Sequence, residues 1–284
     1  MRKVLSWHRT GPLWRVLHYL RYGLPFQLNM RGAWATRHSL TTINLLAVEH
    51  CNNSCRFCST SSPFAGKQTY SADAFLPWLE LLTREGIEFS SIAITGGEPF
   101  LHRDLFGFIS KLNEHFPHKQ IGLTTNFSWA SESRIKQVAP DLKSLDRMLI
   151  SKYPNVVTKL GGEERFNSLV KLVREFSPHL KVAVADAEYM IAWELHPNAR
   201  EPKAFCCTSD CYVLRPNGRI SHCSVGVGLE TRPEFLQIAA KCKEMLYDLN
   251  NGVAGLLSWS RKYPFDLCSY CTLWQGVHVA WQKT

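Results

Sequence analysis

The sequence predicts an α/β protein in which strands and helices alternate over a parallel sheet, followed by a small cysteine-rich appendage. From residue 43 to residue 185, short strand-like runs alternate with stretches whose apolar residues recur at helical spacing. After about residue 200 this alternation ends, and seven of the ten cysteines follow. At 284 residues, the chain is long enough to bury one large core or two smaller ones.

The alternating part is predicted to consist of βα units. Strands are expected at 43–48, 91–95, 121–125, 148–151 and 181–185. Helices are expected at 12–22, 75–82, 105–112, 131–139 and 166–173, where apolar residues form a stripe. Such alternation indicates a parallel sheet that is open or partly closed as a barrel.

The cysteine-rich part carries different signals. Pro216-Asn217-Gly218 separates 212–214 from 219–222 and predicts a hairpin, because Asn-Gly accepts the positive φ of a tight turn. Cys242 falls in a predicted helical stretch with Met245 and Leu246, where we expect it to pack in a core.

The positive charge of the chain is concentrated in its first 40 residues. The formal net charge is +9, and residues 1–40 hold seven Arg and Lys and no Asp or Glu, so the remainder carries only +2. We expect this arm to pack as a cap or to contact an anionic membrane surface, and nucleic acid is not the expected partner. No apolar run approaches the ~18 residues that span a bilayer, and no secretory signal is evident. These features predict a cytoplasmic protein, membrane-associated if the arm binds lipid.

The first cysteine group reads Cys51-Asn-Asn-Ser-Cys55-Arg-Phe-Cys58 and directly follows the first predicted strand. Cysteines in a chain without an export signal favour metal binding over disulfides. An all-thiolate iron–sulfur cluster takes four cysteine ligands, but the next cysteine is the distant Cys206. The loop therefore leaves one iron open to a ligand. A zinc site is the alternative, although zinc modules usually show paired C-x-x-C motifs.

This loop, with Phe57 before its third cysteine, resembles the signature of radical S-adenosylmethionine (SAM) enzymes. The resemblance implies a [4Fe-4S] cluster held by Cys51, Cys55 and Cys58, whose open iron chelates the amino and carboxylate groups of SAM. It also implies that one electron, delivered by a reductase such as flavodoxin or ferredoxin, cleaves SAM into methionine and a 5′-deoxyadenosyl radical. Such a radical removes hydrogen from unactivated C–H bonds, which side chains cannot do.

A glycine-rich turn, Gly96-Gly97-Glu98-Pro99, follows the next predicted strand. Ligands of parallel α/β sheets collect at the carboxyl ends of strands, and glycines let the backbone approach closely. The turn resembles the GGEP motif of the same family, whose backbone and Glu hold the SAM amino group. Gly161-Gly162-Glu163 looks similar but is predicted to start a helix instead.

Two further positions end later strands on the same predicted rim. By resemblance, Asn126 and Ser151 are positions that contact the ribose or the methionine carboxylate of SAM. The alternative is that they are strand-end turn residues. Lys152 and Asp186 lie at the same rim, as candidates for a carboxylate contact and a substrate contact respectively.

The second cysteine group resembles the twitch-type auxiliary domain of some radical SAM enzymes. Its pattern is a Gly-x4-Cys hairpin followed by a distant C-x-x-C. The resemblance implies a second [4Fe-4S] cluster with Cys223, Cys268 and Cys271 as ligands. Cys207 matches the remaining ligand position best, with Cys206 and Cys211 as rivals, and Cys211 is a candidate spare thiol that donates hydrogen to a substrate radical. A four-cysteine zinc site is the alternative.

The resemblance implies a partial (βα)6 TIM-like barrel at 40–200, a twitch-like domain at 201–284 and a basic helical extension at 1–39. We expect an oxidoreductase or epimerase that abstracts hydrogen from a small polar substrate, such as a sugar or aminocyclitol. In dehydrogenation, the auxiliary cluster would accept the second electron. One alternative is a maturase that modifies a peptide or protein side chain, and a more distant one is a non-enzymatic zinc module that binds nucleic acid.

Overall fold

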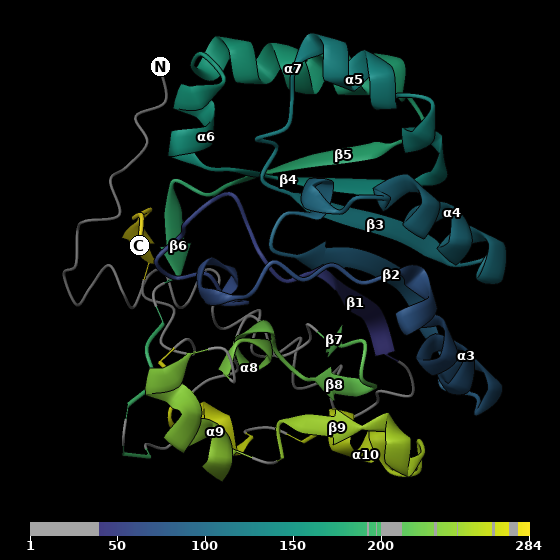
Figure 1. Cartoon of the computed structure of the whole chain (residues 1–284), viewed down its shortest axis with the longest axis vertical. Coiled ribbons are helices and arrows are strands. Elements are labelled where there is room, and N and C mark those ends of the chain that lie inside the picture. Colours follow the sequence, from purple (N-terminus) through teal and green to yellow (C-terminus); the bar gives the residue numbers. More distant parts are fainter. Residues whose placement is uncertain are drawn as a thin grey trace, which may run out of the picture.

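The computed structural model describes residues 40–191, 193–196, 198–199, 212–229, 232–242, 244–262, 265–272 and 278–284. Within these ranges the main sheet has eight strands in the order β5-β4-β3-β2-β1-β7-β8-β9 (Figure 1). The basic arm and its predicted helix at 12–22 lie outside the described residues. No helix in the described part is long and apolar enough to cross a membrane.

Five consecutive strands form the parallel half of this sheet. They are β1 (Leu40–Val48), β2 (Phe89–Gly96), β3 (Gln120–Thr125), β4 (Arg147–Lys152) and β5 (Lys181–Asp186). The helices between them are α3 (Leu76–Arg84), α4 (Leu105–His115), α5 (Glu132–Val138), α6 (Pro154–Lys159) and α7 (Glu163–Phe176). In Figure 1 the helices run along the outside of the sheet, from α3 near β1 to α7 beyond β5. The predicted α/β class and its strands and helices are confirmed here, and Gly162 caps the start of α7 as expected.

The two faces of the parallel half differ in chemistry. Alternate side chains face the helices and are buried and apolar: Ile43, Leu45, Ile92, Ile94, Ile121, Leu123, Met148 and Ile150. The stripes of α3, α4 and α7 complete this core, with Leu79, Ile109 and Phe166 fully buried. The intervening side chains include small or polar, partly exposed residues: Asn44, Ala93, Thr95, Gly122, Thr124 and Ser151. The same face also carries the buried Leu46 and the exposed Leu149. The sheet therefore has one apolar core face and one face of mixed polarity.

The other half of the sheet comes from the cysteine-rich part of the chain. β7 (Tyr212–Leu214) lies parallel to β1, and β8 (Arg219–Ser221) and β9 (Leu246–Asp248) follow in antiparallel order. The predicted hairpin is confirmed, since Gly218 has φ 80° in the turn between β7 and β8. Trp78 on α3 donates its indole N–H to Pro216 O over 3.1 Å, which joins the hairpin to the first helix. The predicted boundary at 200/201 falls outside the described residues and stays a prediction.

Shorter elements complete the described chain. β6 (Tyr189–Ile191) pairs antiparallel with β10 (His278–Ala280). α8 (Ser224–Val227) lies beside β7 and β8, and α9 (Leu236–Lys241) and α10 (Leu256–Ser260) lie on either side of β9 in Figure 1. The 3-10 helices are Ser62–Phe64, Ala72–Ala74, Pro99–Leu101, Asp141–Ser144, Pro233–Phe235, Leu249–Asn251 and Asp266–Ser269. The helical stretch expected around Cys242 is wrong: α9 ends at Lys241, and Leu246 belongs to β9 because its backbone pairs with Ser221.

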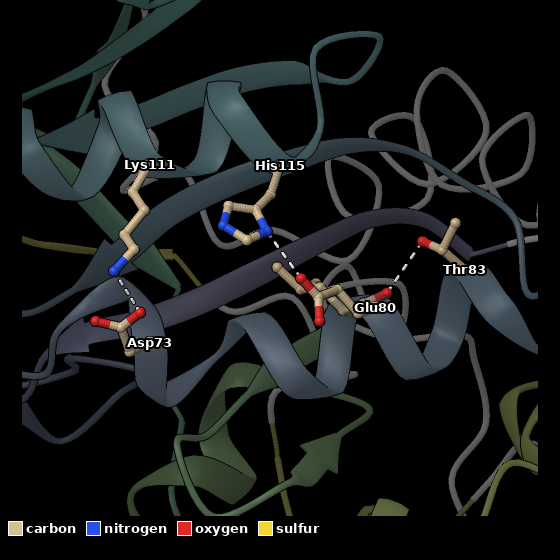
Figure 2. A network of polar contacts seen from close by, with 6 residues as sticks. Asp73, Glu80, Thr83, Lys111 and His115 are labelled. Atoms are coloured by element: carbon tan, nitrogen blue, oxygen red, sulfur yellow. Dashed lines mark hydrogen bonds and ion pairs between the residues drawn. The ribbon is translucent and has the colours of Figure 1, made fainter.

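Exposed polar contacts link α3, its preceding turn and α4 on the outside of the sheet. Figure 2 shows the ion pair between Lys111 and Asp73, and the His115 Nδ1 atom 2.8 Å from Glu80 Oε1. In the same view Thr83 donates to the Leu79 carbonyl within α3. Exposed pairs of this kind contribute little stability, about 0–1 kcal/mol each, and lie away from the strand ends that carry the cysteines.

Candidate active site at the cysteine loop

The cysteine loop, residues 51–58, begins three residues after the end of β1 and lies against the glycine turn after β2. Gly97 N donates to Val48 O over 2.8 Å, and Glu98 N donates to His50 O over 3.1 Å. A Cβ atom on Gly96 would lie 1.9 Å from Val48 O, and one on Gly97 would lie 1.7 Å from His50 O. Both glycines are therefore required by the close approach of two backbones, one of which leads directly into Cys51.

Glu98 is fully buried between the ends of β2 and β3. Its carboxylate accepts hydrogen bonds from Thr125 Oγ1 (2.7 Å), Asn126 N (2.7 Å) and Phe100 N (3.1 Å). Burial raises the pKa of Glu98 to about 7, and the three donors oppose this shift because they favour the charged form. The carboxylate thus joins two strand ends. Its expected contact with the SAM amino group stays a prediction, as does that of the adjoining Pro99, which begins a 3-10 helix.

We expect Glu98→Gln to lower the free energy of unfolding by about 3 kcal/mol, because the amide nitrogen would face a donor inside a buried site. The matched control is Glu163→Gln in the second Gly-Gly-Glu segment. The Glu163 carboxylate is 55% exposed and pairs with Lys152, so its loss should cost less than about 1 kcal/mol. Urea unfolding of both variants measures the difference, and equal losses would show that Glu98 is not a structural link.

Asn126 connects the end of β3 to the cysteine loop. Its Nδ2 atom lies 2.8 Å from Asn52 Oδ1 and 3.5 Å from Cys51 Sγ, while its Oδ1 accepts from Ser128 N over 2.9 Å. Asn52 in turn donates to Ser128 Oγ over 2.7 Å. The predicted rim position is therefore beside the first cysteine, where Asn126 holds both the sulfur and the loop.

A second amide chain reaches the loop from α6. Asn155 Nδ2 donates to Asn53 Oδ1 over 2.7 Å, and Asn53 Nδ2 donates to Cys55 Sγ over 3.3 Å. The Asn53 backbone N–H also lies 3.3 Å from Cys51 Sγ. Sequence reasoning did not single out Asn155; the available signal was Pro154, which starts a helix immediately after β4.

The residues after β3 and β4 add aromatic groups to this rim. Phe127 is fully buried with φ 64°, a conformation that costs a bulky residue about 1–3 kcal/mol and occurs at functional sites. Its N–H is held by Thr125 Oγ1 over 3.0 Å. Tyr153 N donates to Ser151 O over 3.1 Å. The predicted SAM contact Ser151 thus lies at the same rim, beside Tyr153.

The three cysteines fit an iron–sulfur cluster by the chemistry of their surroundings. Each sulfur has a hydrogen-bond partner: the Asn53 and Asn126 amides lie beside Cys55 and Cys51, and Thr60 Oγ1 lies 3.3 Å from Cys58 Sγ. Burial raises the pKa of Cys51 to about 12 and that of Cys55 to about 11, so both are neutral thiols until a metal deprotonates them. In the described part of the chain, no three His, Cys, Asp or Glu side chains are grouped as a single ion would need. The argument for an iron–sulfur cluster therefore rests on the three thiol groups and on the hydrogen bonds around them.

Two described members of the second cysteine group lie around a smaller core. Cys223 and Cys271 pack on an apolar cluster that includes Trp193, and Phe57 of the first loop packs on the same cluster. Trp193 Nε1 donates to Phe57 O over 3.2 Å, which links the two cysteine groups. Cys268 lies within the 3-10 helix Asp266–Ser269 and packs against the main core. Cys206, Cys207 and Cys211 lie outside the described residues, so the remaining ligand assignment stays a prediction.

Cys242 lies in the same small core and is 4% exposed. Burial raises the pKa of this thiol to about 12, with nearby Asp266 and Cys268 adding to the shift. The predicted packing role of Cys242 agrees with this burial.

The fold and the site together define an α/β enzyme domain with a cysteine loop at the carboxyl ends of its parallel strands. Residues 46–152 match the radical SAM superfamily, and this range includes the three cysteines and the glycine turn. Residues 46–152 of the chain therefore form a radical SAM domain. The family implies a [4Fe-4S] cluster and SAM as cofactors, in agreement with the prediction.

Several known proteins are similar to this chain. The GTP 3′,8-cyclase of Nautilia profundicola is 29% identical over 132 residues, 45% of this chain and 41% of that protein. The probable GTP 3′,8-cyclase of Sulfolobus acidocaldarius is 32% identical over 143 residues, 48% and 42% respectively. The chain spans less than half the length of these relatives. The crystal structure of BtrN in complex with AdoMet and 2-DOIA has TM-score 0.52 and 15% identity, covering 82% of this chain and 93% of BtrN, and shows a shared fold.

Proposed function

We propose that this chain abstracts hydrogen from a small polar substrate of the sugar or aminocyclitol class, giving dehydrogenation or epimerisation. The observation that carries the proposal is the contact between the glycine turn and the cysteine loop, with Glu98 N 3.1 Å from His50 O. Through this contact, the three cysteines and the glycine turn lie next to each other at one rim of the sheet. The adjoining sheet face carries polar side chains that can bind a hydrophilic substrate, beside the apolar Leu46 and Leu149.

Cys51, Cys55 and Cys58 would hold the cluster, and Gly96 and Gly97 keep the adjoining rim free of side chains. When bound, the cluster and SAM supply a 5′-deoxyadenosyl radical. The amide groups of Asn53 and Asn126 donate hydrogen bonds to cysteine sulfurs, which holds the cysteine loop in one conformation. The chain's contribution is therefore to hold and orient its cofactors.

The sheet face offers groups that recognise hydroxyls and amines. Thr95 and Thr124 contribute two hydroxyls, and Asn44 contributes an amide whose Nδ2 also donates to Tyr212 O over 3.1 Å. Hydroxyl and amide side chains both donate and accept hydrogen bonds, so they suit a polyhydroxylated ligand. A peptide substrate would need an additional recognition surface, which is why the maturase alternative ranks second.

A nucleotide substrate is the competing small-molecule candidate. It is supported by the sequence similarity to two GTP 3′,8-cyclases, which covers 45% and 48% of this chain. The substrates to be tested therefore include GTP as well as sugars and aminocyclitols.

A second [4Fe-4S] cluster forms part of the proposal. Cys223, Cys268 and Cys271 would hold it, with Cys207 preferred over Cys206 and Cys211 for the remaining position. Cys211 stays the candidate hydrogen-donor thiol. Flavodoxin or ferredoxin would supply electrons, and the arm 1–39 would provide any contact with an anionic membrane.

The test is anaerobic reconstitution followed by incubation with SAM and dithionite. We expect a brown protein with about eight irons that releases 5′-deoxyadenosine, and about four irons in Cys268→Ala. Deuterated substrates then report the abstracted hydrogen by transfer of deuterium into 5′-deoxyadenosine. Deuterium transfer from GTP alone would replace the sugar or aminocyclitol assignment. A brown protein that makes no 5′-deoxyadenosine would overturn the enzymatic proposal.

A further inference from the structure

Residues 278–284 form a segment, here called the strap, that lies across the cysteine loop. The strap begins as β10, which pairs antiparallel with β6 through Ala280 and Tyr189 (Figure 1). Trp281 N then donates to Glu188 O over 2.7 Å. This anchoring directs the next residues toward the cysteines, which precede the strap by more than two hundred positions.

The strap and the loop form a short antiparallel bridge centred on Cys55 and Lys283. Arg56 N donates to Gln282 O, and Thr284 N donates to Ser54 O, each over 2.9 Å. Side chains strengthen the same bridge. Arg56 Nη1 lies 2.7 Å from Gln282 Oε1, and Thr284 Oγ1 lies 3.0 Å from Ser54 O. The backbone on both sides of the middle cysteine is thus held by the strap.

Trp281 contacts the sulfur of that cysteine directly. Its indole N–H donates to Cys55 Sγ over 3.2 Å. The Trp281 ring lies 6.5 Å from the Tyr153 ring, centroid to centroid, and the Cys55 residue is 5% exposed. An N–H group aimed at a buried ligand sulfur interacts with whatever charge that sulfur carries, with little screening by water.

We propose that the strap positions the cysteine loop and that Trp281 is a positioning residue that raises the reduction potential of the cluster bound there. The inference rests on the proposed assignment of Cys51, Cys55 and Cys58 as ligands. Reduction adds one electron, taken from a low-potential donor such as dithionite, and makes the ligand sulfurs more negative. A hydrogen-bond donor stabilises that added charge, so it favours the reduced state.

Trp281→Phe removes the N–H group and keeps an aromatic ring. At a fixed solution potential, we expect about a tenfold fall in the reduced-to-oxidised ratio, which is about 59 mV for a one-electron couple. Potentiometric titration followed by electron paramagnetic resonance measures this shift. Thr284→Val is the matched control, because it removes a strap hydroxyl without touching the sulfur, and its midpoint potential should equal that of the wild type.

A second variant tests the strap without altering Trp281. Thr284→Pro removes the N–H group that donates to Ser54, and we expect severalfold faster iron release to a ferrous chelator than in Thr284→Val. If Thr284→Pro releases iron at the wild-type rate, the strap does not position the cysteine loop. If Trp281→Phe has the wild-type midpoint potential, Trp281 does not raise the reduction potential of the cluster. Neither result would affect the proposed function if the wild type still cleaves SAM. A wild type without a cluster would instead refute the proposed function.

Discussion

Gly97→Ala is expected to destabilise the protein by about 3 kcal/mol and to abolish binding of the first cluster. The new methyl group would lie 1.7 Å from His50 O, 2.2 Å from His50 C and 2.7 Å from Cys51 N. All three atoms belong to the backbone, so no side-chain rotation relieves the overlap. The strand end must move, and it carries the first cysteine ligand with it.

Gly66→Ala is the matched control for this substitution. A Cβ atom at Gly66 would have only Gln68 Cγ as a neighbour, at 4.0 Å, and no positive φ is recorded there. We expect Gly66→Ala to have the same free energy of unfolding and the same iron content as the wild type. Urea unfolding and iron analysis of the two variants measure both effects, and normal iron content in Gly97→Ala would contradict the close-approach argument.

Cys55→Ala is expected to reduce SAM cleavage more than about 100-fold, because loss of a ligand should exceed the 10–100-fold cost of losing groups around one. Iron content should fall to about four atoms, those of the second cluster. The variant also loses the acceptor of the Trp281 and Asn53 hydrogen bonds. 5′-Deoxyadenosine formation and iron content are the measurements.

Cys242→Ala is the control for the loss of a buried thiol. Cys242 packs in the small core at 4% exposure, so its substitution should cost about 1–2 kcal/mol of stability and leave iron content unchanged. If Cys55→Ala kept about eight irons and SAM cleavage while Cys242→Ala lost iron, the two cysteine assignments would have to be exchanged.

The strand–helix alternation could be predicted because each element carries its own periodicity. Gly218 likewise marked its hairpin through local backbone chemistry, and the cysteine spacing marked the loop. The expected helix around Cys242 was wrong because the chain after α9 enters the ladder with β8. A partner strand that lies elsewhere in the sequence overrode a local helical pattern.

The partners of the cysteine loop could not be predicted in the same way. Asn155 lies 102 positions from Asn53, and Trp281 lies 226 positions from Cys55. Their side chains are ordinary surface or core types in the sequence, and only the folded chain brings them to the sulfurs. The same holds for Glu98, where the motif indicated a ligand contact and folding surrounded the carboxylate with three donors.

The class of the sheet, the three-cysteine loop and the glycine turn were predictable, because they depend on local periodicity and on residues close together in the chain. That β7 lies beside β1, that Glu98 joins two strands and that Trp281 contacts Cys55 became visible in the folded chain alone. These contacts depend on packing and hydrogen bonds between distant segments. Such bonds form where the whole fold places donor and acceptor within about 3 Å, a distance that no local pattern specifies.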